Sequence, residues 1–156
     1  HKLKHIINDL EALKNPLLPT PSLRQFQGEQ GVRDMLATQI SQSSVENETL
    51  HIICNQPFLG SFQDHFKEIS KQYIDQNFSV KVLLQTTEED PIFIKIRNFE
   101  VKATNQKYVF AAGMDVIGDF VGYWTEVDSL VGQLMENQQI ARLQAAMFEQ
   151  VWNSIA

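Results

Sequence analysis

The sequence is poor in the residues and motifs that build catalytic or metal centres. Cys54 is the only cysteine among 156 residues, which excludes an internal disulfide and any metal site made from several cysteines. The glycine-rich phosphate and dinucleotide loops, the zinc-protease motif and the nucleophile elbow of the hydrolases are all missing. No apolar run is long enough to cross a bilayer, and no signal-peptide pattern is seen. We therefore expect no metal, no cofactor, no membrane contact and a cytoplasmic location.

Positive charge is also scarce. There are 13 lysines and arginines against 19 aspartates and glutamates, a net charge of −6 at neutral pH. Neutralising the phosphates of a nucleic acid requires a basic surface, so this part of the protein is not expected to bind DNA by electrostatics. A hydrophobic content of 43% over this length is typical of one globular domain with a sizeable core.

The few side chains that could do chemistry are not grouped. None of the four histidines, His1, His5, His51 and His65, has metal-ligand spacing. Cys54 ends an apolar run, where a cysteine usually behaves as a small buried hydrophobe. Ser61 and Asp64 have the spacing of a helix-capping box, which is a structural signal. The sequence therefore predicts no enzyme active site.

The centre of the chain has the pattern of a strand, a helix and a second strand. Leu50–Cys54 and Val80–Leu84 are short apolar runs, and between them an apolar helical face runs from Phe62 to Ile74. A crossover of this kind predicts parallel strands with a right-handed connection. Before it, a short strand is expected ahead of Gly28, followed by a helix.

The C-terminal third predicts antiparallel strands and a closing helix. Gly118-Asp119 lies between two apolar runs, a two-residue hairpin signal, and Leu130–Met135 follows as another strand. The last helix is expected to bury one apolar face. That face consists of Ile140, Leu143, Met147, Phe148 and Val151, extended by Trp152. Together these patterns predict an α/β domain over residues 20–156, with a mixed β-sheet flanked by helices.

The first residues form a separate pattern. Leu3, Ile6, Leu10 and Leu13 are spaced by three, four and three, as in a heptad repeat. Residues 1–15 could form a helix that pairs with a second chain, giving a homodimer, or one that packs on its own domain. Prolines end the helix at Pro16 and Pro19. Because the chain begins at His1 and within a helical pattern, we expect it to be part of a longer protein.

Polar residues at strand ends are the candidates for binding a small molecule. Asn55 and Gln85 follow the two parallel strands, where ligands of open α/β sheets collect. Arg24 could bind an anion or pair with a neighbouring carboxylate. Tyr123 and Trp124 could stack on a sugar or another flat ligand. Ordinary core and loop roles are the alternative for each of these residues.

Two blocks of residues carry a resemblance to a known family. The opening motif consists of Pro21, Arg24, Phe26, Gly28, Gly31, Val32 and Leu36. The closing block consists of Ile117, Gly118, Asp119, Val121, Gly132, Glu136, Asn137, Ile140, Ala141, Gln144, Met147, Phe148, Glu149 and Trp152. These blocks resemble the C-terminal domain of TrmB-type transcriptional regulators.

The resemblance implies a phospholipase D-like fold in the effector-sensing domain of a DNA-binding regulator. Residues 1–15 would then be the dimerising linker helix, and DNA would be bound only by a winged helix-turn-helix domain outside this chain. Some members of the family sense sugars. The HxKxxxxD motif of phospholipase D enzymes is missing, so a non-enzymatic role is expected. A divergent phosphodiesterase and a ligand-free protein-interaction module are the alternatives.

Overall fold

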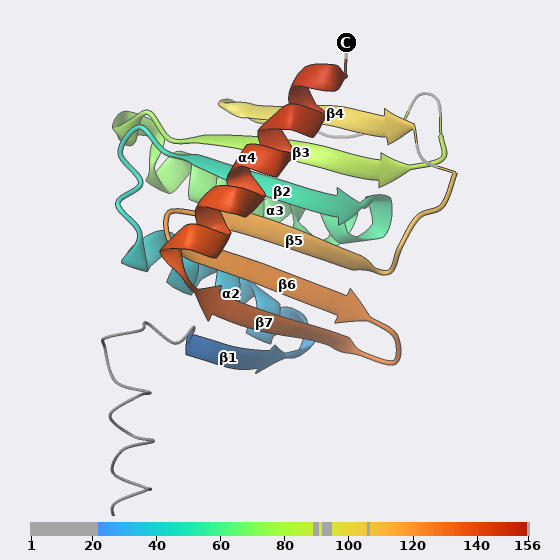
Figure 1. Cartoon of the computed structure of the whole chain (residues 1–156), viewed down its shortest axis with the longest axis horizontal. Helices are drawn as coiled ribbons and strands as arrows, with labels where there is room; N and C mark the ends of the chain where they lie inside the picture. The colour runs from blue at the N-terminus through green and yellow to red at the C-terminus, as the bar shows by residue number, and fades with distance from the viewer. Residues whose placement is uncertain (1–21, 89–90, 92–94, 106, 156) are drawn as a thin grey trace, which may run out of the picture.

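A computed structural model describes residues 22–88, 91, 95–105 and 107–155 of the chain. Within them, seven strands form one mixed sheet in the order β1-β7-β6-β5-β2-β3-β4 (Figure 1). Strands β2, β3 and β4 are parallel, and the other neighbouring pairs are antiparallel. The predicted α/β class with a mixed sheet flanked by helices is confirmed.

The first strand and helix meet at a glycine. Strand β1 (Ser22–Gln27) runs along the edge of the sheet, antiparallel to β7, and α2 (Gly28–Gln42) follows at once. Gly28 has a φ of +76°, a conformation that glycine adopts without steric cost. Helix α2 buries Val32, Met35 and Leu36 against the sheet, in agreement with the apolar spacing of this segment.

The predicted parallel crossover is confirmed. Strand β2 (Thr49–Asn55) leads through α3 (Gln56–Gln72) and a short 3-10 turn (Ile74–Gln76) to β3 (Ser79–Thr86). The helix begins earlier than the capping-box spacing of Ser61 predicted. Its cap is Asn55, and Pro57 lies in the first turn, where a proline loses no helical hydrogen bond.

The apolar positions change from even-numbered isoleucines to Phe99 and Val101 at Asn98, and the structure has a turn there. Asn98 has a φ of +59°, and β4 (Phe99–Asn105) begins directly after it, parallel to β3. Of the alternating isoleucines before Asn98, those within residues 92–94 lie outside the described residues. The left-handed conformation of Asn98 therefore fixes the start of β4.

The C-terminal strands form the predicted meander. Strands β5 (Ala112–Ile117) and β6 (Phe120–Glu126) are joined by the Gly118-Asp119 turn, in which Gly118 has a φ of +55°. Strand β7 (Leu130–Glu136) pairs with β6 and leads into α4 (Gln138–Ser154). The sequence located all four elements correctly.

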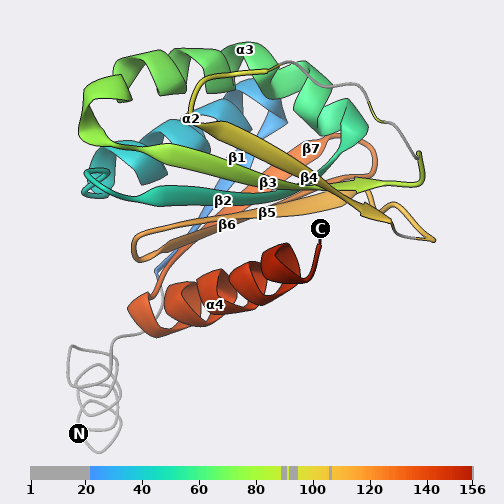
Figure 2. The same ribbon diagram turned by 90° about the horizontal axis from the view of Figure 1, so that it is seen from above.

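The described elements form three layers (Figure 2). Helices α2 and α3 cover one face of the sheet and α4 crosses the other face diagonally (Figure 1). The largest apolar cluster fills the α2–α3 side and includes Phe62, Phe66 and Leu84. On the α4 side, two smaller clusters hold the helix, one around Phe148 and Trp152 and the other around Ala141 and Val121.

The predicted buried face of α4 is partly wrong. Phe148 and Trp152 are buried as expected, but Leu143, Met147 and Val151 are largely exposed. The helix carries two apolar stripes, and Ala141 belongs to the one that packs on the sheet. A helical period identifies apolar residues without saying which stripe faces the core.

The predicted linker helix at residues 1–15, with Leu3, Ile6, Leu10 and Leu13, lies outside the described residues. Its role in dimerisation therefore stays a prediction. Among the helices of the described segments, none is both long enough and apolar enough to traverse a membrane.

Candidate functional site

The carboxyl ends of β2 and β3 bring two of the predicted ligand residues together. Asn55 and Gln85 are direct register partners. The Asn55 Nδ2 donates to the Phe110 carbonyl at 3.1 Å. The Gln85 Nε2 donates to the Ala112 carbonyl at 3.1 Å, and its Oε1 accepts from the Phe110 amide at 3.3 Å. Both side chains therefore bind the β4–β5 connection, which passes over this end of the sheet. In open α/β sheets, ligands often bind at this end.

The other three predicted ligand residues lie apart from this pair. Arg24 is exposed on edge strand β1 and donates to Gln42 Oε1 at 3.3 Å, so its partner is an amide of α2. Trp124 is buried and its ring stacks on Phe58 at 4.3 Å between centroids.

Tyr123 points to the opposite side of the sheet, where its hydroxyl accepts from Gln144 Nε2 of α4 at 3.4 Å. The two neighbouring aromatic residues therefore do not form one stacking surface. Ligand binding stays a prediction for all five residues, Arg24, Asn55, Gln85, Tyr123 and Trp124. In the structure each of them makes a contact within the protein.

Asn55→Ala tests the structural role of this residue. Its Oδ1 accepts from the Phe58 amide at 2.9 Å and caps α3, and the loss of such a cap costs about 1 kcal/mol of unfolding free energy. Asn137→Ala is the matched control, because Asn137 caps α4 in the same way at 3.0 Å from the Ile140 amide. Denaturant unfolding should show a loss for Asn55→Ala at least as large as that for Asn137→Ala, because Asn55 also loses its hydrogen bond to the Phe110 carbonyl. An unchanged stability for Asn55→Ala alone would contradict the capping role.

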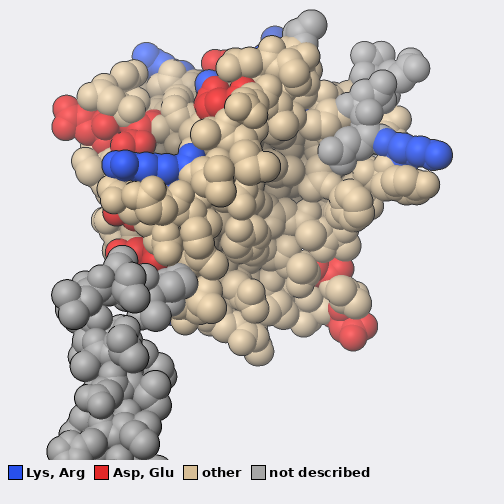
Figure 3. Space-filling view, viewed as in Figure 1, with Lys and Arg blue, Asp and Glu red and all other residues tan. Residues whose placement is uncertain are grey.

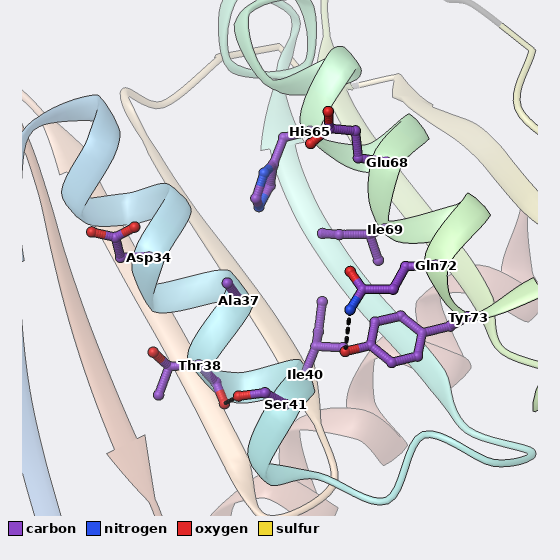
Figure 4. Close-up of a pocket in the computed structure, with 10 residues that line it drawn as sticks. All are labelled: Asp34, Ala37, Thr38, Ile40, Ser41, His65, Glu68, Ile69, Gln72 and Tyr73. Carbon is purple, nitrogen blue, oxygen red and sulfur yellow. Dashed lines mark hydrogen bonds between the residues drawn. The ribbon is translucent and has the colours of Figure 1, made fainter.

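A groove of about 440 Å³ runs between α2 and α3 and was not predicted (Figure 4). Ile40 and Ile69 supply apolar contacts, and polar side chains come from both helices. The polar lining residues are Asp34, Thr38, Ser41, His65, Glu68, Gln72 and Tyr73. In Figure 4, His65 and Glu68 lie near one end, and the Gln72 Nε2 meets the Tyr73 hydroxyl at 3.5 Å near the other. Several donors and acceptors therefore converge on one cavity with an apolar floor.

His65 is the most distinctive group in this groove. Its Nε2 is buried and makes no hydrogen bond to any described residue. Burial, assisted by the positive charge of Arg33, lowers the pKa of His65, and the carboxylates of Glu68 and Asp34 oppose the shift. A neutral imidazole beside carboxylates can both donate and accept, which suits hydroxyl and amine groups of a polar ligand. The sequence offered no signal for it, since the lining residues come from two helices.

The arrangement that most resembles catalytic geometry involves His51 on the α4 side. Its Nε2 lies 2.8 Å from Glu149 Oε1, and the Lys81 Nζ lies 3.1 Å from the same oxygen. Burial lowers the pKa of His51 more than the Glu149 hydrogen bond raises it. The ring also packs edge-on against Phe148. A carboxylate that orients a histidine is one part of a nucleophilic site. Here the three groups join β2, β3 and α4, so they also anchor the helix.

The described residues contain no group of three or more histidine, cysteine, aspartate or glutamate side chains suited to a metal ion. Cys54 is fully buried, and burial strongly raises the pKa of its thiol, so its surroundings suit a core residue. These features describe three layers with a polar groove between α2 and α3, and a sheet end at which Asn55 and Gln85 bind the β4–β5 connection.

Comparison with known proteins adds a likeness of fold. No family model matches the sequence, and no curated protein matches it. The fold is similar to that of TrmBL2, an archaeal chromatin protein whose structure shows a novel mode of DNA binding. The two share a TM-score of 0.53 at 13% sequence identity, over 99% of this chain and 60% of that one. The chain thus spans about three fifths of the length of that structure.

Proposed function

We propose that the chain is the regulatory domain of a TrmB-like DNA-binding transcriptional regulator. The observation that supports this most is the fold likeness to TrmBL2 along nearly the whole chain. The acidic charge of −6 fits a part that does not itself contact DNA. In this proposal a winged-helix domain outside the chain binds DNA, residues 1–15 pair two copies as a linker helix, and the protein acts in the cytoplasm.

The domain would act by sensing a small polar effector, such as a sugar, in the groove between α2 and α3. The groove has a size suited to a small ligand, and its convergent polar groups could fix a ligand's orientation. An effector that binds one arrangement of the two copies more tightly would shift the equilibrium between arrangements and so change DNA binding. The role requires no covalent chemistry.

The effector proposal is tested by a thermal-shift screen of sugars and nucleotides, since a ligand that binds the native state raises the melting temperature. Ala37 lies in the groove and is exposed, so Ala37→Tyr should obstruct the groove without disturbing the core. Ala146→Tyr, at an exposed alanine of α4, is the matched control. A hit is expected to lose its shift only in Ala37→Tyr. A shift that survives in both variants would place the ligand elsewhere.

The enzymatic alternative is favoured by one observation, the His51–Glu149 contact at 2.8 Å. It is tested by incubating the purified chain and a His51→Ala variant with a generic phosphodiester substrate. We expect no turnover by either protein. Sustained hydrolysis that His51→Ala abolishes would replace the regulatory proposal with a phosphodiesterase.

A further inference from the structure

Helix α4 buries only part of its apolar surface against the sheet. One stripe, with Ala141, Phe148 and Trp152, is buried against the sheet. A second stripe, with Leu143, Met147 and Val151, is exposed by 58%, 54% and 46%. Residues four apart lie above one another on the same side of a helix, so these three side chains form a continuous strip. Single exposed apolar residues are ordinary, but an aligned strip indicates an interaction surface.

The sheet surface beside α4 continues this strip. Leu23 of β1, exposed by 66%, pairs with Met135 of β7, and Gln133 of β7 pairs with Tyr123 of β6. Tyr123 packs with Ile140 of α4, so this alternating set of side chains lies on the α4 side. We call the outer stripe of α4 together with this side of β1, β7 and β6 the uncharged face.

The uncharged face stands out in an acidic chain. Figure 3 shows the α4 side of the molecule, and a broad area from its centre to its lower edge contains no lysine, arginine, aspartate or glutamate. The carboxylate of Glu149 on α4 lies outside this area, because it binds His51 of β2 and Lys81 of β3. A nucleic acid or a strongly charged peptide would find no complementary charge here. Two copies with a net charge of −6 each would repel least with these faces together.

The uncharged face has the size of a small homodimer interface. A helix of 17 residues is about 25 Å long and about 10 Å wide. Three strands of six or seven residues add an area of roughly 14 by 20 Å. Because α4 covers part of β6 around Val121, the projected open area is below roughly 500 Å², and side-chain relief increases the accessible area. A stable interface buries about 800 Å² per partner.

We infer that the uncharged face binds the same face of a second copy of this chain around a two-fold axis. Met147 is the middle residue of the stripe, so in an antiparallel pairing of two α4 helices it lies closest to the axis and meets its own counterpart. A two-fold contact uses the same patch on both copies, so one self-complementary stripe is sufficient. This surface is independent of the pairing proposed for residues 1–15.

The inference is tested by disulfide formation in the full chain. Met147→Cys places a thiol at the proposed axis, and native Cys54 is fully buried and should not compete. Asn153→Cys, at an exposed position about a third of the way around the helix from Met147, is the matched control. Mild oxidation should give a covalent dimer for Met147→Cys several-fold faster than for Asn153→Cys. Equal rates would reflect random collision and would overturn the inference.

Sedimentation equilibrium separates this interface from the linker-helix proposal. Met147→Glu should raise the dissociation constant at least about tenfold, because it buries a charge against its counterpart. Leu10→Glu should leave the α4 contact intact even if it abolishes pairing through residues 1–15. Loss of association only in Leu10→Glu would overturn the inference. A Leu10→Cys/Met147→Cys protein that closes a disulfide within a monomer would also overturn it, by assigning the uncharged face to the chain's own first segment.

Discussion

Asp115→Asn is expected to raise the free energy of unfolding above pH 7. The difference in this free energy between the variant and the wild type should be up to about 4 kcal/mol more favourable there than at pH 4. Asp115 lies on β5 and is fully buried. Burial raises its pKa to about 7 from an ordinary value of 3.8, and the neighbouring Gln39 amide opposes the rise. The difference of about 3 pH units corresponds to about 4 kcal/mol at 1.36 kcal/mol per unit.

The sign follows from proton binding. The folded chain binds this proton more tightly than the unfolded chain, so protonation of Asp115 favours folding. Its contribution is complete below about pH 4 and is lost as the pH rises through about 7. Above that pH the folded state must hold a buried carboxylate whose oxygens make no well-formed hydrogen bond to any described residue. Asparagine has nearly the same shape and carries no charge, so the variant should not show this loss.

The measurement is the free energy of unfolding of the wild type and the variant from pH 4 to pH 9. His51 and His65 have pKa values lowered by burial, so their contributions are present at high pH and lost as the pH falls. These opposing terms occur in both proteins and cancel in the difference. Asp119→Asn, at an exposed aspartate in the adjoining turn, controls for the change in net charge. A difference that does not vary with pH would contradict a raised pKa at Asp115.

The buried polar pair also shows what the sequence could not reveal. Asp115 and Gln39 occupy ordinary positions in a strand and a helix. Their side chains can lie next to each other only because the facing residue on the neighbouring strand has no side chain. Gly122 is that residue, and a β-carbon there would overlap Asp115 Oδ1 and approach Gln39 Oε1. Three residues from three elements make one polar site. Periodicity within each element contains no information about such a meeting.

Local signals predicted the fold better than the site. The hairpin at Gly118-Asp119 and the crossover from β2 to β3 could be located because turn residues and apolar runs act over a few positions. Sequence reasoning also expected Asn55 and Gln85 at one sheet edge, and the structure places them there. The groove around His65 could not be found, because its walls come from α2 and α3, whose packing is a tertiary property.

The sequence also limits how two of the predicted ligand residues could act. Tyr123 and Trp124 are adjacent residues of a strand, and successive side chains of a strand point to opposite faces. Each of them could therefore stack on a ligand only from its own side of β6. The two stripes of α4 are a different case, since both have the period of a helix and only the sheet decides which is buried.

Trp152→Ala is expected to release α4 from the sheet and to lower the unfolding free energy by about 3–5 kcal/mol, the usual cost of removing a buried tryptophan. Trp152 packs with Phe148 and Leu83 in a small cluster, with the Phe148 ring stacked at 5.8 Å. The Lys102 Nζ lies 4.7 Å from the centroid of the indole ring and donates to the Trp152 carbonyl at 3.0 Å. The indole therefore joins the last turns of α4 to β3 and β4.

The effect should be local to the α4 side. The main apolar cluster between the sheet and α2–α3 does not include Trp152, so β2 and β3 should keep their hydrogen-exchange protection while α4 amides lose theirs. Leu143→Ala is the matched control, because Leu143 lies on the same helix but is 58% exposed, and it should change stability by less than about 0.5 kcal/mol. Both variants are compared at a concentration where the chain sediments as a monomer. A loss below about 1 kcal/mol for Trp152→Ala, or equal losses for the two variants, would mean that α4 is held by contacts other than this cluster.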